Sequence, residues 1–126
     1  MRSALILSPD SELRLVLIRL LGRNGWSVDA TACTDRALSF LTEDPRNLTL
    51  IDWEASYAGV QAFLTAIRMH PVWHPARVLA LCWGSDSEDA REAFEFGASG
   101  ILVKPLCLND LLEKAEMPRP LLQGIP

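Results

Sequence analysis

The chain has 126 residues, of which 49% are hydrophobic and 22% are charged, and its formal net charge is −4. This length suits a single domain that buries a core without metal or disulfide support, and it leaves no room for a second folded domain. The acidic balance argues against a nucleic-acid surface, and charges interrupt every apolar stretch before it could span a membrane. Because the first residues run into a short predicted strand rather than a signal sequence, we expect a cytoplasmic protein.

Short apolar runs alternate along the chain with segments whose apolar residues recur at helical spacing. The runs predict strands at residues 4–7, 28–32, 48–52, 78–82 and 101–103. Between them, apolar residues recur at i, i+3, i+4 and i+7, which predicts helices that pack on a sheet. These apolar stripes comprise Leu13, Val16, Leu17, Leu20, Leu21, Ala37, Leu38, Leu41, Val60, Phe63, Leu64, Ile67, Ala90, Ala93, Phe94, Phe96, Leu108, Leu111 and Leu112.

Small residues and glycines mark the predicted ends of the helices. Thr34 or Asp35 is the predicted N-terminal cap of the second helix, and Gly97 is the predicted C-terminal cap of the fourth. The segment after Asp52, residues 53–59, lacks periodicity and is predicted to be a loop. Residues 117–126 contain three prolines and one glycine, a composition typical of a tail or linker after a domain at residues 1–116.

Five strand-helix units without a hairpin signal predict an α/β protein with a doubly wound parallel sheet. In such a sheet the carboxyl ends of the strands share one edge, where ligands and chemistry collect. The residues predicted to lie on that edge are Ser8, Pro9, Asp10, Asp52, Cys82, Trp83 and Lys104.

Cysteine and histidine spacing does not indicate a metal site. Cys33, Cys82 and Cys107 are odd in number and lack a Cys-x-x-Cys pair, so buried free thiols are expected. His70 and His74 are four residues apart, but Pro71 breaks the helix that would align them, which favours loop histidines. Trp73, between them, has no predicted core position and is a candidate for an exposed protein-binding patch.

The chain resembles the receiver domain of two-component response regulators over residues 3–116. The resemblance is carried by a strand that ends in Asp52, a strand that ends at Cys82, the Gly-Ala pair at 97–98, and Lys104-Pro105. It implies a flavodoxin-like fold, with five strands in the order 2-1-3-4-5 and five helices. It also implies that Asp52 holds the phosphoacceptor position served by a histidine kinase. Lys104 would then pair with the phosphoryl oxygens, and its bond to Pro105 would be cis.

The sequence departs from the family where magnesium is bound. In the family an acidic pair ends the first strand and holds Mg²⁺ together with the phosphoacceptor, whereas here Ser8 and Pro9 stand at these positions. Asp10 is expected to cap the first helix rather than to bind metal. Glu54 and Asp52 are the remaining weak candidates for metal ligands, and Glu54 is expected to be a solvated loop residue.

Two further departures affect the phosphate site and the switch. Cys82 stands where the family has a Thr or Ser hydroxyl, and a thiol is a weak donor. We expect an inert buried thiol rather than a redox sensor. Trp83 follows it where a small residue usually leaves the acceptor open, and the indole could cover Asp52. Ile101 occupies the position of an aromatic switch residue and cannot report a hydroxyl contact.

These departures predict a degenerate receiver that acts as a phosphorylation-independent protein-interaction module, without catalytic residues or a cofactor. The alternative is a working phosphoacceptor, modified on Asp52 by a histidine kinase with Mg²⁺. A mononucleotide binder is disfavoured because no phosphate loop follows the first strand.

The expected partners are proteins: a histidine kinase, an effector domain, or a second copy that docks on the face of the fourth helix, fifth strand and fifth helix. We expect this face to be of mixed charge, with Glu88, Arg91, Glu92, Glu95, Lys104, Asn109, Asp110, Glu113 and Lys114.

Overall fold

The computed structural model describes residues 2–54 and 59–116. Strands and helices alternate along the chain without exception in the described part. The strands are β1 (Arg2–Leu7), β2 (Trp26–Thr31), β3 (Leu48–Asp52), β4 (Arg77–Cys82) and β5 (Gly100–Val103). The helices are α1 (Ser11–Arg23), α2 (Thr34–Glu43), α3 (Val60–Met69), α4 (Glu88–Phe96) and α5 (Leu108–Glu116).

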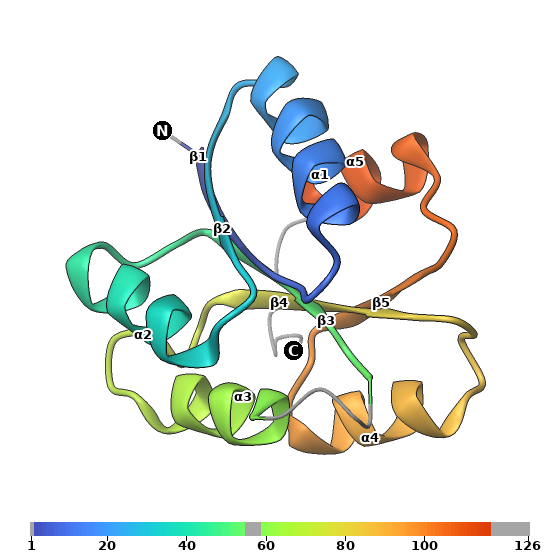
Figure 1. Cartoon of the computed structure of the whole chain (residues 1–126). Coiled ribbons are helices and arrows are strands. Elements are labelled where there is room, and N and C mark those ends of the chain that lie inside the picture. The colour runs from blue at the N-terminus through green and yellow to red at the C-terminus, as the bar shows by residue number, and fades with distance from the viewer. Residues whose placement is uncertain (1, 55–58, 117–126) are drawn as a thin grey trace, which may run out of the picture.

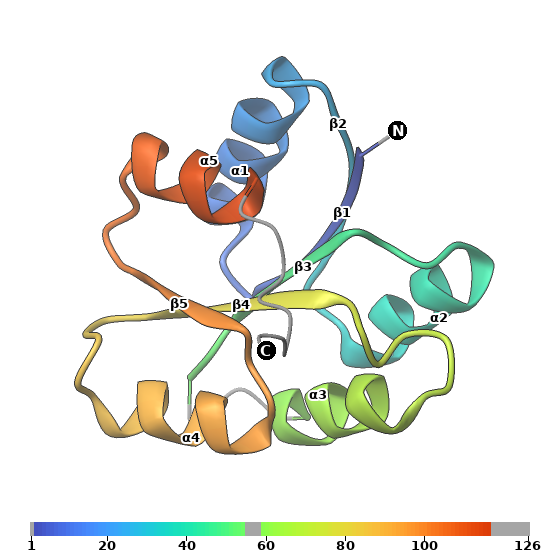
Figure 2. The same ribbon diagram turned by 180° about the vertical axis from the view of Figure 1, so that it is seen from behind.

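The five strands form one parallel sheet in the order β2-β1-β3-β4-β5. Helices α2, α3 and α4 cover one face of this sheet, while α1 and α5 cover the other (Figures 1 and 2). The core is split accordingly into two clusters, one on each face of the sheet. The predicted doubly wound fold with the strand order 2-1-3-4-5 and five helices is therefore confirmed.

The central strands are buried because helices cover both of their faces. Every residue of β3 and of β4 is buried, which explains why these segments are mostly apolar and do not alternate between apolar and polar residues. The observed β2, Trp26–Thr31, starts two residues earlier than the strand predicted at 28–32, and its last residue is also one position earlier. The other strands match their predicted positions to within two residues.

The predicted caps are correct at two helices and wrong at one. Asp10 is the N-cap of α1, where its side chain accepts hydrogen bonds from the amides of Glu12 and Leu13. Gly97 ends α4 with φ 112°, in the left-handed region that favours glycine. The prediction that Thr34 or Asp35 caps α2 is wrong, because Thr34 is already helical and Cys33 takes the N-cap position without a side-chain hydrogen bond.

Three residues that are predicted to face the core lie instead at the surface: Val16, Phe94 and Leu108. The helical stripes are narrower than the sequence indicates, since α1 buries Leu17 and Leu21 fully and α4 buries its two alanines. Apolar residues on the flanks of these stripes are left in contact with solvent.

The cysteines and the connection after α3 also differ from expectation. Only Cys82 is buried, whereas Cys33 and Cys107 are exposed because they lie in the segments just before α2 and α5. Trp73 is half-buried against the core and stacks on His70 with ring centroids 3.7 Å apart, so it does not form an exposed patch. His70 lies after the end of α3, as expected of a loop histidine, and it accepts hydrogen bonds from two backbone amides of this loop.

Most of the loop at residues 53–59, and the whole tail at 117–126, lie outside the described residues. Within the described ranges, no helix combines the length and the apolar character needed to cross a membrane.

Candidate functional site

Asp52 is the last residue of β3 and lies at the carboxyl edge of the sheet. The parallel register pairs it with Leu81 of β4. Ser8 follows β1 directly and Lys104 follows β5 directly, so three strand ends bring polar residues to the same edge. The side chain of Asp52 is fully buried there.

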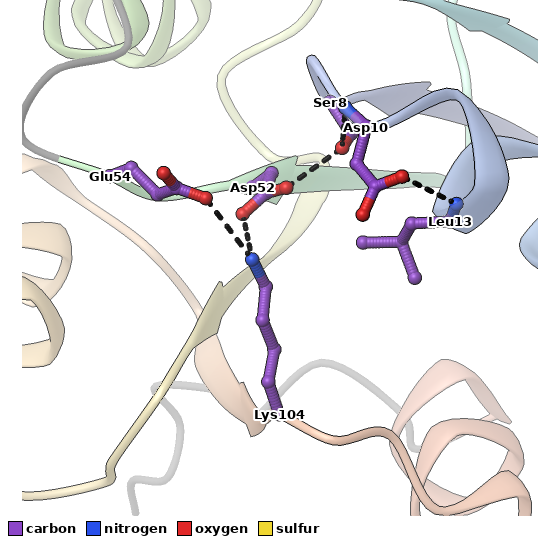
Figure 3. Close-up of polar contacts among 6 residues, drawn as sticks. All are labelled: Ser8, Asp10, Leu13, Asp52, Glu54 and Lys104. Atoms are coloured by element: carbon purple, nitrogen blue, oxygen red, sulfur yellow. Dashed lines mark hydrogen bonds and ion pairs between the residues drawn. The ribbon is translucent and has the colours of Figure 1, made fainter.

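Ser8 is bonded directly to Asp52. Its hydroxyl donates to Asp52 Oδ2 over 2.7 Å, and it accepts a hydrogen bond from the backbone amide of Asp10 over 3.1 Å (Figure 3). Arg14 of α1 donates to the backbone carbonyl of Ser8 over 2.7 Å and holds the turn in place. The residue that stands where the family has an acid is therefore a positioned hydrogen-bond donor to Asp52.

Lys104 supplies the positive charge of the site. Its Nζ is 2.5 Å from Asp52 Oδ1, and the indole ring of Trp83 lies over the ammonium group with 5.3 Å to the ring centroid. Burial lowers the pKa of Lys104, but the hydrogen bond and charge of Asp52, followed by those of Glu54, outweigh this and raise it. The peptide bond between Lys104 and Pro105 is cis, as the resemblance implies. Trp83 thus shields the lysine that binds Asp52.

Pro9 and Asp10 do not contribute metal ligands. Pro9 is exposed and has no side-chain oxygen. Asp10 Oδ1 accepts hydrogen bonds from the amides of Glu12 and Leu13, at 3.0 and 3.2 Å, so its carboxylate points along α1 and away from Asp52 (Figure 3). The predicted capping role of Asp10 is confirmed.

Glu54 is the second carboxylate of the site. Its Oε2 is 3.4 Å from Lys104 Nζ, although 40% of its side chain is exposed. Glu54 therefore has the exposure expected of a loop residue, and its carboxylate also contacts Lys104. The ammonium group contacts both carboxylates.

The residues at this edge therefore do not fit Mg²⁺. Magnesium requires near-octahedral oxygen ligands, whereas both oxygens of Asp52 are bonded to protein donors and Glu54 is shared with Lys104. Among the residues that the structure describes, no group of three or more His, Cys, Asp or Glu side chains is placed to hold a metal.

Cys82 and Ile101 belong to the core on the side of α3 and α4. Burial, and then the charge of Asp89, raise the pKa of the Cys82 thiol to about 11, with Lys104 acting in the opposite sense and Asp52 adding to the rise. Ile101 is buried and aliphatic, so it offers no hydroxyl for a switch. Cys82 is therefore a neutral thiol at physiological pH, of low reactivity.

A thiol-labelling experiment tests this assignment. With Ellman's reagent at about pH 8, we expect the native protein to release two equivalents rapidly, from Cys33 and Cys107, and the third only in denaturant. Folding raises the pKa of Cys82 from 9.0 to about 11. The contribution of this thiol to the stability of the native state is therefore complete below about pH 9 and is lost as the pH rises toward 11. Cys82→Ala is the control, and three equally fast equivalents in the native parent would contradict the assignment.

Trp53 is predicted only as the first residue of a loop, but it is a core residue that joins β3 to α4. Its ring is buried beside Phe96, and its Nε1 donates to Glu92 Oε1 over 2.8 Å. An aromatic residue directly after a buried strand is the only sequence signal for this contact. It couples the residue next to Asp52 to the helix that carries the candidate docking face.

Of the residues predicted for that face, Lys104 is buried, whereas the others are exposed or half-buried. Large apolar side chains are exposed there or beside it: Trp83 (68% exposed), Phe94 (51%), Val103 and Leu108. These four residues, here called the apolar face, lie at the end of β4, on α4, at the end of β5 and at the start of α5.

Comparisons with known proteins agree with this geometry. The family model described as response regulator receiver domain matches residues 4–116. No curated protein matches the sequence.

Solved structures share the fold at low sequence identity. The chemotaxis protein CheY4 of Vibrio cholerae is 24% identical, with a TM-score of 0.81 over 90% of this chain and 94% of that one. A two-component response regulator from Clostridium difficile is 19% identical, with a TM-score of 0.79 over 90% and 92%. The receiver domain of a Francisella response regulator is 18% identical, with a TM-score of 0.78 over 91% and 93%.

Proposed function

The chain belongs to the response regulator receiver domain family, and from this premise we propose that it works in two-component-type regulation without being phosphorylated. In this proposal it is a protein-interaction module rather than an enzyme. It needs no metal or cofactor, and its Asp52 is a structural anion.

The hydrogen bond from Ser8 to Asp52 is the observation that carries this proposal. A phosphoacceptor carboxylate needs one oxygen free to attack the phosphorus in line with the leaving group. Here Ser8 donates to Oδ2 and Lys104 donates to Oδ1, and the side chain is fully buried. The two donors hold both oxygens in a site that is closed to solvent, so a phosphodonor could reach Asp52 only if the residues around it moved.

The charge balance of the site supports the same conclusion. A phosphoryl group adds about 1.5 to 2 negative charges, and a receiver offsets them with Mg²⁺ and a lysine. At this site Lys104 is already paired with Asp52 and Glu54. One ammonium group that already faces two carboxylates leaves the added charge uncompensated in a buried position.

The apolar face supports a protein as the partner. Trp83, Phe94, Val103 and Leu108 expose large apolar side chains in the neighbourhood of α4, β5 and α5. Aromatic residues are enriched at protein interfaces. We propose that a histidine kinase, an effector domain or a second copy of the chain docks on this face. In this proposal the domain keeps one conformation, because Lys104 and Ser8 remain bonded to Asp52.

Intact-protein mass spectrometry tests the proposal. The protein is incubated with acetyl phosphate and millimolar Mg²⁺, and we expect no species heavier by one phosphoryl group, because Asp52 is bonded and no metal site exists beside it among the described residues. The control is Asp52→Asn, which removes the acceptor carboxylate. A phosphorylated species in the parent that disappears in Asp52→Asn would establish the alternative function, a working phosphoacceptor.

A further inference from the structure

A cavity lies at the edge of the sheet opposite Asp52. Its volume is about 430 Å³, and it opens beside the first residues of β1, β2 and β4. Ala115 and Glu116, the last two residues of α5, form part of its wall. The ten residues of the tail, 117–126, are therefore joined to the domain at the wall of this cavity.

The part of the wall that an occupant could touch is largely apolar. Val72 is 59% exposed, and Pro45 is also exposed. Trp73 and Ala76 are half-buried. Exposed apolar side chains around a hollow gain stability when another apolar group covers them. The wall therefore favours an occupant with apolar side chains.

Ion pairs within the protein already neutralise much of the charge at the wall. Arg2 pairs with Glu116, and Arg46 pairs with Asp29 over 2.8 Å. A charged occupant would compete with these partners instead of meeting an unpaired charge. A segment with little charge fits the cavity better than an ion does.

The tail has the composition that this wall favours. Its only charged side chain is that of Arg119, and its larger apolar side chains are those of Met117, Leu121, Leu122 and Ile125. Prolines on both sides of Arg119 favour an extended backbone, which advances about 3.1 Å per residue. Leu121 comes five residues after Glu116, so it can reach any point within about 15 Å of the end of α5.

The volume of the cavity suits these side chains. A cavity of about 150 Å³ holds one benzene-sized group, so the cavity beside α5 has room for about two side chains of the size of leucine. We propose that the tail binds in this cavity of its own chain, with Leu121 and Leu122 packed against Val72 and Trp73. The segment that leaves the domain is then fixed at the edge opposite Asp52, and the apolar face stays open to a partner.

Paramagnetic broadening in NMR spectra of the full chain tests the proposal. A nitroxide is attached at Gln123→Cys, with Cys33→Ser and Cys107→Ser so that no other exposed thiol is labelled. We expect the amide signals of Val72 and Ala76 to lose most of their intensity relative to the same sample after reduction of the nitroxide. Signals from the apolar face should keep their intensity.

The double variant Leu121→Ser with Leu122→Ser removes the proposed contact without altering the core of the domain. In the spin-labelled chain it should restore the signals of Val72 and Ala76. In the unlabelled chain it should lower the thermal midpoint by about 5 °C, because two apolar side chains lose their burial. Gln123→Ser, in the same tail, is the control and should leave the midpoint unchanged.

Three results would overturn the proposal. Broadening on the apolar face would place the tail there, and unchanged signals at Val72 and Ala76 would mean that the tail does not enter the cavity. In a mixture of isotope-labelled parent and spin-labelled chain without isotopes, broadening at these two residues would show that the tail of a second copy binds there.

Discussion

Replacing Lys104 by methionine is expected to lower the free energy of unfolding by about 3 kcal/mol. Methionine keeps much of the length and apolar stem of lysine but removes the ammonium group 2.5 Å from Asp52 Oδ1. The Asp52 carboxylate then remains buried with Ser8 as its only side-chain donor among the described residues. Urea unfolding followed by circular dichroism measures the loss, with EDTA present so that no divalent cation replaces the ammonium.

The double variant Asp52→Asn with Lys104→Met is the matched control. It removes both charges, so it should regain at least about 1 kcal/mol relative to Lys104→Met alone, because removing one partner of a buried pair costs more than removing both. A Lys104→Met protein within about 0.5 kcal/mol of the parent would mean that the pair contributes little and that Asp52 is solvated in solution.

The pH dependence of the same pair has a definite sign. Folding raises the pKa of Lys104, so its contribution to stability is complete below the unfolded value of about 10.4 and is lost as the pH rises through the higher folded value. The gap in stability between parent and Lys104→Met should therefore be constant near neutral pH and narrow only in strong alkali.

The fold was predictable because local and global signals agree in this sequence. Short, mostly apolar runs at β3 and β4 favour strands that are covered on both faces, and the helical stripes between them favour parallel crossovers. Surface positions were less predictable. Phe94 and Leu108 share the spacing of core residues but lie on the flank of the buried stripe, and only the packing of α4 and α5 on the sheet decides their exposure.

The candidate site was predictable in its members but not in its contacts. Strand ends placed Asp52, Ser8 and Lys104 at one edge, because parallel strands align their carboxyl ends. The sequence could not show that the Ser8 hydroxyl points at Asp52, or that Glu54 turns back toward Lys104, since both depend on rotamers and on the course of a loop.

Restoring the acidic pair with Ser8→Asp and Pro9→Asp should convert the site to one that needs metal. The new carboxylate at position 8 would stand where a hydroxyl now lies 2.7 Å from Asp52 Oδ2. Like charges about 4 Å apart at an effective dielectric of about 20 repel by about 4 kcal/mol, so we expect a loss of about 3 kcal/mol in EDTA. Mg²⁺ at about 100 times its dissociation constant should return about 2.7 kcal/mol. Urea unfolding with and without Mg²⁺ measures both values.

The neutral double variant Ser8→Asn with Pro9→Ala separates charge from shape and from the loss of proline rigidity, and its stability should not respond to Mg²⁺. One outcome is that acetyl phosphate phosphorylates the acidic variant in the presence of Mg²⁺ and that Asp52→Asn abolishes this phosphorylation. That result would mean that the missing acids alone explain why Asp52 of the parent is not phosphorylated. If the acidic variant binds Mg²⁺ but stays unphosphorylated, the remaining block is assigned to Trp83 over Lys104 and to the thiol of Cys82. If Mg²⁺ stabilises the parent as strongly as it stabilises the acidic variant, the parent has a metal site. This result would also contradict the proposal that Ser8 and Lys104 keep Asp52 permanently bonded.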